Sequence, residues 1–155
     1  MTSLKLSPAM AGFRIKRQTF IRRLPDATQL INVQRSVASN NDTVIITLNF
    51  GIYLPDLALL LGDPAEIEDI QKSHWQSRIG SFIPESGGDK WWRISSLPEA
   101  EEASIGVVSL LEKTVLPHIE SLSNAAALCE LWKQGKHPGI FRADCDMYVA
   151  KLCST

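Results

Sequence analysis

The chain has 155 residues and a mass of 17.2 kDa, the size of one domain built on one hydrophobic core. Hydrophobic residues make up 45% and charged residues 21%, a balance that excludes an intrinsically disordered chain. The longest uncharged apolar run, residues 57–62, is far shorter than the ~20 residues that span a bilayer. Residues 1–12 also lack the continuous apolar core of a signal peptide. We therefore expect a single cytoplasmic domain over residues 1–155, with no membrane contact.

The amino-terminal part predicts a short helix followed by the first strand of a sheet. The helix is expected over residues 4–10, and Gly12 is well placed to end it. The clearest strand that follows covers residues 18–24, in which Phe20 shares a face with Arg22. The turn formers of residues 25–27 join this strand to the next one, which predicts a hairpin.

Residues 28–53 predict two adjacent strands, which are the centre of the expected sheet. Side chains alternate over residues 30–36, with Ile31 and Val33 on one face and polar groups on the other. Residues 43–53 are rich in β-branched and aromatic residues, and their even-numbered apolar side chains are expected to face the core. If the two strands pair as a hairpin, their polar side chains meet on one side of the sheet, although the sequence does not fix the register. These side chains are Asn32, Gln34, Ser36, Thr47 and Asn49.

The middle of the chain predicts two more strands. Residues 57–61 are apolar enough for a buried helical turn, and residues 66–73 read as an acidic surface loop. This loop lacks the glycine and the spacing of a calcium-binding hand, so no metal site is predicted. Alternation predicts a fourth strand over residues 74–83 and a fifth over residues 90–94.

The adjacent residues Trp91 and Trp92 point to opposite faces of the fifth strand. One can then fill the core while the other lies on the open face near Arg78 as a binding anchor. The alternative is that both are packed beneath neighbouring loops.

The carboxyl-terminal third predicts helices. Ser96 can cap a helix whose apolar stripe should cover the sheet, and Pro117 bends or restarts this helix. The expected stripe consists of Ile105, Val108, Leu110, Leu111 and Val115. Further helices are expected over residues 125–134 and 142–152, the latter with Met147, Tyr148 and Leu152 inward. The predicted fold class is therefore α+β, with an antiparallel sheet of about four to five strands (about residues 12–95) covered on one face by helices (about residues 97–153).

The cysteines and the basic residues have simple explanations. Three cysteines without Cys-x-x-Cys spacing predict reduced, buried thiols and no metal or other cofactor. They are Cys129, Cys145 and Cys153. Seven of the eight charged residues up to Ser36 are basic, which could attract nucleic acid. We expect them instead to pair with acids of the same fold.

A set of motifs occurs in order along the chain. They are Gly12-Phe13-Arg14-x-Lys16, Phe20-x-Arg22, Val33-Gln34-Arg35-Ser36, Leu48-Asn49-Phe50-Gly51-Ile52-Tyr53, Arg78-Ile79-Gly80 and Trp91-Trp92. This set resembles the successive signatures of the bacterial domain of unknown function 4304 family, from Gly12 to the helix after Pro98. The helix before Gly12 is shorter than the family pattern and is interrupted by Pro8. The resemblance implies an α+β domain of bacterial cytoplasmic origin, and it brings no established activity or catalytic residue.

The motifs of common enzyme classes are missing, because the chain has no Gly-rich phosphate loop, nucleophile elbow or metal-ligand spacing. We expect a non-enzymatic module, immunity-like or adaptor, that binds another protein through the polar face of its sheet. One alternative is an enzymatic or small-ligand domain in which Arg22 and Arg78 hold an anion on that face, with His74 as general base. The third is nucleic-acid binding through the basic first third. The candidate binding residues are Arg22, Asn32, Gln34, Ser36, Asn49, Arg78, Trp91 and Trp92.

Overall fold

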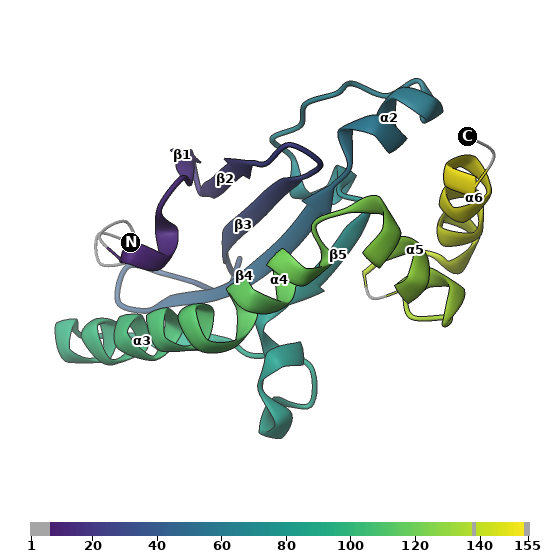
Figure 1. Ribbon diagram of the computed structural model, residues 1–155. Helices are drawn as coiled ribbons and strands as arrows, with labels where there is room; N and C mark the ends of the chain where they lie inside the picture. Colours follow the sequence, from purple (N-terminus) through teal and green to yellow (C-terminus); the bar gives the residue numbers. More distant parts are fainter. Residues whose placement is uncertain (1–6, 138, 154–155) are drawn as a thin grey trace.

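The structure, a computed structural model, describes residues 7–137 and 139–153 and has an α+β fold (Figure 1). In this described part, the strands pair antiparallel in the order β1-β2-β3-β4-β5, and β6 pairs with β4 beside β5. The strands are β1 (Arg14–Lys16), β2 (Thr19–Arg23), β3 (Thr28–Arg35), β4 (Val44–Tyr53), β5 (Trp75–Arg78) and β6 (Trp92–Ile94). The predicted fold class is confirmed, with six strands in place of the expected four to five.

The two hairpins predicted from residues 18–53 are both present. β2 pairs with β3 from Thr19 opposite Asn32 onward, and β3 pairs with β4 along its whole length. The short strand β1 is a separate element, because the chain reverses at Arg17, whose φ is 55°. No glycine marks that turn, so the sequence gives no local signal for it. The helix predicted over residues 4–10 lies partly outside the described residues, and the turn η1 (Pro8–Met10) is its described part.

Helices cover one face of the sheet, as predicted. They are α3 (Leu97–Leu110), the π-helical turn η5 (Leu111–Val115), α4 (Leu116–Leu122), α5 (Ala125–Lys133) and α6 (Arg142–Cys153). Figure 1 shows α4 in front of the sheet, with α5 and α6 beyond β5. On this face Phe20, Ile31 and Phe50 share one large core cluster with side chains of the helices. The apolar side chains that alternate along the central strands therefore form the sheet side of the main core.

The helix that begins at α3 covers the sheet with a stripe that differs from the predicted one. Ser96 caps α3 as expected, because its Oγ accepts a hydrogen bond from the Glu99 N–H at 3.4 Å. Ile105, however, is 72% exposed, and Val107 is buried in its place. The prediction assumed one uninterrupted α-helical period, whereas the wide turn η5 lies within this helix. α4 then restarts at Leu116, with Pro117 in its first turn, as predicted.

The other face of the sheet has an apolar cover at one end, and at the other end the loop before β6 buries Thr47, whose Oγ1 donates to the Lys90 carbonyl at 2.7 Å. Ile21, Leu30 and Tyr53 form a second, smaller core cluster with residues of α2 (Pro55–Leu61) and of the following loop. The loop expected to be a surface feature contributes Ile67 and Ile70 to this cluster, the latter in the turn η2 (Ile70–Lys72). The rest of this face keeps the polar side chains of β3 and β4. This face of the sheet is therefore divided into an apolar half, covered by α2 and the following loop, and a polar half.

Three local expectations are corrected by the structure. The strand predicted over residues 74–83 ends at Arg78 and continues as the turns η3 (Ile79–Phe82) and η4 (Pro84–Ser86). In that turn the backbone at Gly80 packs against the backbone of Asp89, where a Cβ would be 2.6 Å away. Cys129 and Cys145 are buried free thiols, but Cys153 is exposed. Met147, expected to face inward on α6, is 43% exposed, and Cys145 is buried instead.

Candidate functional site

Polar side chains of three neighbouring strands meet on the open half of the sheet. Asn32 lies opposite Asn49, Gln34 opposite Thr47, and Asn49 in turn opposite Arg78. Residues directly opposite each other in antiparallel strands project to the same face. The register of the β3–β4 hairpin therefore brings four of the five predicted polar side chains together, while Ser36 lies just beyond the paired residues.

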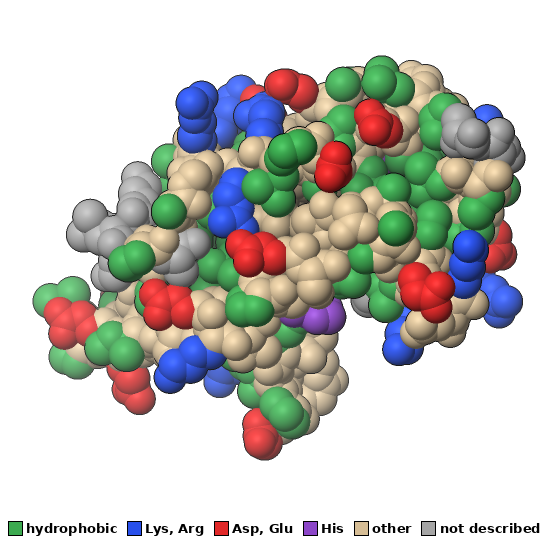
Figure 2. Space-filling view, in the orientation of Figure 1, with side chains coloured by type: hydrophobic (Ala, Val, Ile, Leu, Met, Phe, Trp, Pro, Cys, Tyr) green, Lys and Arg blue, Asp and Glu red, His purple; other side chains and the backbone are tan. Residues whose placement is uncertain are grey.

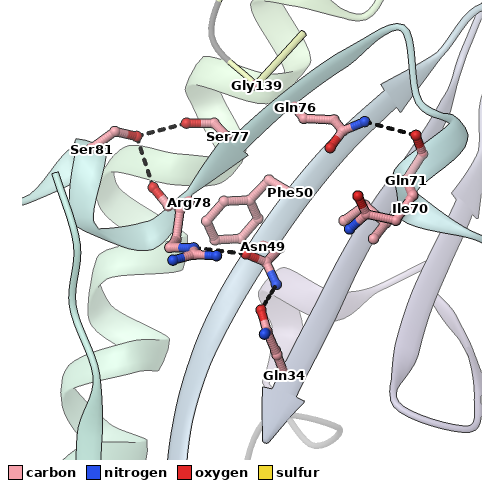
Figure 3. Close-up of a pocket in the computed structure, with 10 residues that line it drawn as sticks. All are labelled: Gln34, Asn49, Phe50, Ile70, Gln71, Gln76, Ser77, Arg78, Ser81 and Gly139. Atoms are coloured by element: carbon pink, nitrogen blue, oxygen red, sulfur yellow. Dashed lines mark hydrogen bonds between the residues drawn. The ribbon is translucent and has the colours of Figure 1, made fainter. Parts of the chain in front are cut away.

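Three of these side chains are joined by hydrogen bonds across the strands (Figure 3). Asn49 Nδ2 donates to Gln34 Oε1 at 2.9 Å, and Arg78 Nε donates to Asn49 Oδ1 at 3.1 Å. Both functional ends of the Asn49 amide are thus committed, which fixes its orientation. The chain of bonds runs from β3 through β4 to the edge strand β5.

The loop before β6 extends this chain of bonds. Arg78 Nη1 donates to both carboxylate oxygens of Asp89 at 3.3 Å, and Trp91 Nε1 donates to Asp89 Oδ2 at 2.9 Å. The Arg78 guanidinium also lies over the Trp91 ring, 5.7 Å from its centroid. The Trp91 hydrogen bond, with the hydrogen bond and charge of Arg78, lowers the pKa of Asp89, which is therefore ionised at neutral pH. We call Gln34, Asn49, Arg78, Asp89 and Trp91 the polar row.

A hollow adjoins the polar row along β5. One cavity of about 360 Å³ is lined by residues of the row and by Gln71, Gln76 and Gly139. A second cavity of about 470 Å³ shares these same three residues and continues to Phe141 and Tyr148 of the carboxyl-terminal segment. Gln76 Nε2 donates to the Gln71 carbonyl at 3.0 Å at the junction (Figure 3). We call the two adjoining cavities the trough.

Three predicted site residues, Asn32, Ser36 and Trp92, are not members of the polar row. Asn32 is on the same face, where its Nδ2 donates to Thr19 Oγ1 at 3.0 Å. Ser36 follows the end of β3, and its Oγ accepts from the Ala38 N–H at 3.2 Å. Trp92 packs against the main core on the opposite face, so the two tryptophans do separate as the strand alternation predicts.

Arg22 lies on the helix-covered face and is not part of this site. Its Nε donates to Gln29 Oε1 at 2.8 Å, and its Nη2 forms an ion pair with Glu120 at 2.7 Å. Buried Gln29 in turn donates to Ser123 Oγ at 2.7 Å. Because Arg22 and Arg78 project from opposite faces of the sheet, they cannot hold one anion between them. The sequence already indicated this position, because Arg22 is two residues from Phe20 and therefore shares its face of the strand.

His74 is a packed residue of the apolar half. It is 2% exposed, its Nδ1 accepts from the Leu54 N–H at 3.0 Å, and its ring stacks on Tyr53 with centroids 4.4 Å apart. Burial lowers the pKa of His74 to about 4, while the charge of Asp63 partly opposes this shift. With a pKa this low the buried imidazole is a weak proton acceptor, and its Nδ1 already accepts a hydrogen bond, so His74 does not suit the general base proposed for it.

A family model described as "Domain of unknown function (DUF4304)" matches residues 9–121, most of the chain and the whole of the polar row. The chain belongs to the DUF4304 family. No curated protein sequence and no solved structure matches it significantly. The matched DUF4304 region ends at Ser121, whereas Leu128, Trp132 and Cys145 belong to the main core. The carboxyl-terminal helices therefore complete the core that the family region begins.

Two glycines of the DUF4304 motifs allow close packing beside the site. A Cβ on Gly51 would lie 2.3 Å from Ser73 Oγ, and one on Gly80 would meet the Asp89 backbone at 2.6 Å. Neither glycine has a positive φ, so close approach rather than backbone conformation requires them. Gly80 thereby sets the position of the loop that carries Asp89 and Trp91.

Three of the six basic residues described up to Ser36 form ion pairs with acids of the same fold, as expected for them. Lys16 contacts Glu68 at 2.6 Å and Arg23 contacts Glu66 at 2.8 Å, in addition to the Arg22 ion pair. These pairs use the acidic loop that superficially resembled a metal site. In the described part of the chain, no group of three or more His, Cys, Asp or Glu is placed to hold a metal ion. None of the helices described there is long and apolar enough to cross a membrane.

Proposed function

We propose that this protein is a non-enzymatic binding module, immunity-like or adaptor, that recognises another protein through the polar row and the trough. The observation that carries this proposal is the row itself, a pre-ordered set of amide, guanidinium, carboxylate and indole groups on the uncovered half of the sheet. Such groups lose little conformational freedom on binding, because they are already held by one another.

The composition of the surface supports a protein partner. Arg and Trp are enriched in protein interfaces, where an aromatic anchor commonly lies among hydrogen-bonding groups. Trp91 is half-buried beside Arg78 and supplies such an anchor. At the far end of the trough Phe141 is 81% exposed, which adds an apolar contact to a mostly polar surface.

The test is capture of a partner from a lysate of the native host, followed by titration with the purified partner. The informative variant is Gln34→Ala/Arg78→Ala, which removes both ends of the hydrogen-bonded chain through Asn49. The matched control, Gln134→Ala/Arg142→Ala, removes the same residue types from exposed positions that do not line the trough. A photo-crosslinking residue at Gln71 marks whether the captured protein contacts the trough.

We expect the wild type and the control to bind the same protein, and the row variant to bind it at least ~10-fold more weakly, a loss of about 1.4 kcal/mol. Circular dichroism and thermal unfolding establish that both variants are folded. Equal binding by the row variant, or capture of the partner with no crosslink from Gln71, contradicts the proposal.

A further inference from the structure

A further hollow opens on the helix-covered side of the molecule, and it shares Ser77 and Ser81 with the first cavity of the trough. It has a volume of about 610 Å³ and lies between β5 with the turn η3, the π-helical turn η5 with α4, and α5. Figure 2 shows the surface hollowed between the projecting segment that contains η3 and η4 and helix α5. Its lining consists of Trp75, Ser77, Ser81, Phe82, Lys113, Thr114, His118, Leu131 and Lys136. We call it the basic hollow.

The charge of the basic hollow is one-sided. Lys113 lines it from η5 and Lys136 from the segment that follows α5, and no Asp or Glu is among its described lining residues. Within the described residues, neither lysine has a carboxylate partner within 4 Å. This contrasts with Lys16, Arg22 and Arg23, each of which has such a partner. Two uncompensated ammonium groups beside one cavity create a positive potential that attracts an anion.

The inner wall of the basic hollow is apolar and aromatic. Trp75, only 1% exposed, lines it together with Phe82 and Leu131, and the His118 ring packs edge-on against Phe82 at 5.4 Å. Trp75 Nε1 is buried, and no described residue accepts its hydrogen bond. A buried indole N–H without an acceptor is uncommon, because it loses its hydrogen bond to water. This wall suits the apolar body of a ligand rather than a bare inorganic ion.

The two serine hydroxyl groups of the basic hollow have no proton left to donate to an anion. Ser81 Oγ donates to the Arg78 carbonyl at 2.7 Å, so Ser77 must be the donor in the 2.6 Å Ser77–Ser81 contact. Both serine protons are therefore used, and these groups can only accept hydrogen bonds. The donors without a described partner are the two ammonium groups and the Trp75 indole N–H, and Thr114 and His118 line the hollow beside Lys113.

The turn η5 builds this side of the hollow. Leu111 and Val115 of the turn are buried, while Lys113 and Thr114 between them line the cavity. A π-helical turn widens a helix by one residue and often occurs at functional sites. We propose that the basic hollow binds a small organic anion, a carboxylate or phosphate ester whose charged group pairs with Lys113 and Lys136 and whose apolar body packs on Trp75 and Phe82.

The test is a titration followed by two-dimensional amide and indole NMR, with the Trp75 indole signal assigned from Trp75→Phe. The probes are benzoate and phenyl phosphate, with neutral benzamide and inorganic phosphate as references, each added up to about 10 mM. We expect benzoate or phenyl phosphate to shift the Trp75 indole N–H and the amides of residues 113–118. The stronger of the two identifies the charged group, and both references should bind at least ~10-fold more weakly.

Two double variants separate site binding from general charge attraction. Lys113→Gln/Lys136→Gln should weaken probe binding at least ~10-fold, whereas Lys90→Gln/Lys133→Gln removes the same charge outside the lining and should leave it within about twofold. Gln34→Ala/Arg78→Ala should also bind the probe normally, so this proposal and the proposed function can fail independently. No shift of the Trp75 indole with either anion, equal binding of benzamide, or equal weakening by both lysine variants overturns the proposal.

Discussion

At the scale of single residues, the site depends on glycines whose neighbours leave no room for a methyl group. Gly51 lies within β4, two residues before its end, where a glycine weakens a strand and therefore needs a reason. The reason is the segment 70–73, which packs directly on its Cα: a Cβ would lie 2.3 Å from Ser73 Oγ and 2.9 Å from Ile70 Cγ1. This contact closes the apolar half of the open face, and its partner is 22 residues away in the sequence.

We predict that Gly51→Ala destabilises the protein by ~1–3 kcal/mol, because the methyl group overpacks this contact. Gly106→Ala is the control, since a Cβ at that exposed position in α3 meets nothing within 4 Å and alanine favours a helix by ~1 kcal/mol. Urea unfolding measures both changes. Ser73→Gly added to Gly51→Ala should recover part of the loss, because the contact with Ile70 Cγ1 remains. If it recovers none, close approach of Ser73 is not the reason for the glycine.

At the scale of elements, alternation predicts the strands β2, β3 and β4 well, because each has one buried face. The same alternation places Gln34 and Asn49 on one face, and the β3–β4 register then confirms that they meet. The sequence does not predict the position of Asp89, because the loop 84–91 is placed by its packing on Gly80. It does not predict the trough either, because Gly139, which is distant in sequence, helps to line it. Contacts between distant loops leave no periodic signal.

The turn η5 does leave a signal, which the predicted stripe did not use. Val107, Leu111, Val115 and Ile119 are all buried and are spaced by four residues. In a regular α-helix, each four-residue step drifts by roughly 40°, so three steps would rotate the stripe away from the sheet. The wide turn corrects the drift. It also precedes Pro117, which has no N–H to donate and would clash with a carbonyl inside a regular helix.

We predict that deletion of Thr114 converts this region to a regular α-helix and places Pro117 in its interior, at a cost of ~3 kcal/mol. Adding Pro117→Ala to the deletion should recover most of that stability, whereas Pro117→Ala alone should change it by less than ~1 kcal/mol. Chemical denaturation of the three variants measures these differences. A deletion variant that Pro117→Ala does not rescue would show that proline is not the source of the cost.

At the scale of the whole molecule, two core clusters on opposite faces of the sheet stabilise the fold. The smaller one is packed against His74, whose pKa is lowered by burial from 6.5 to about 4. Between these values the unfolded chain binds the proton and the folded chain does not. Stability must therefore rise with pH across this window and fall as the solution is acidified.

We predict that His74 contributes a loss of ~3 kcal/mol in the free energy of unfolding between pH 7 and pH 4. His74→Asn keeps an acceptor for the Leu54 N–H, so it should be less stable at pH 7 but lose less stability on acidification. Urea unfolding at several pH values from 7 to 4 measures this, with His137→Asn as the control. A His74→Asn slope as steep as that of the wild type contradicts the assignment.

The edge of β4 has a consequence for how members of the family can diverge. Two short strands share this edge, β5 along Asn49–Ile52 and β6 along Val44–Ile46, and the chain between them leaves the sheet as a projecting arm. The arm supplies Asp89 to the polar row and Phe82 to the basic hollow. At its tip, a side chain added at Gly87 or Gly88 would meet nothing within 4 Å. Insertions there can change the shape of both surfaces while the strand register stays the same. Members of the family can therefore acquire different binding preferences while their sheet folds in the same way.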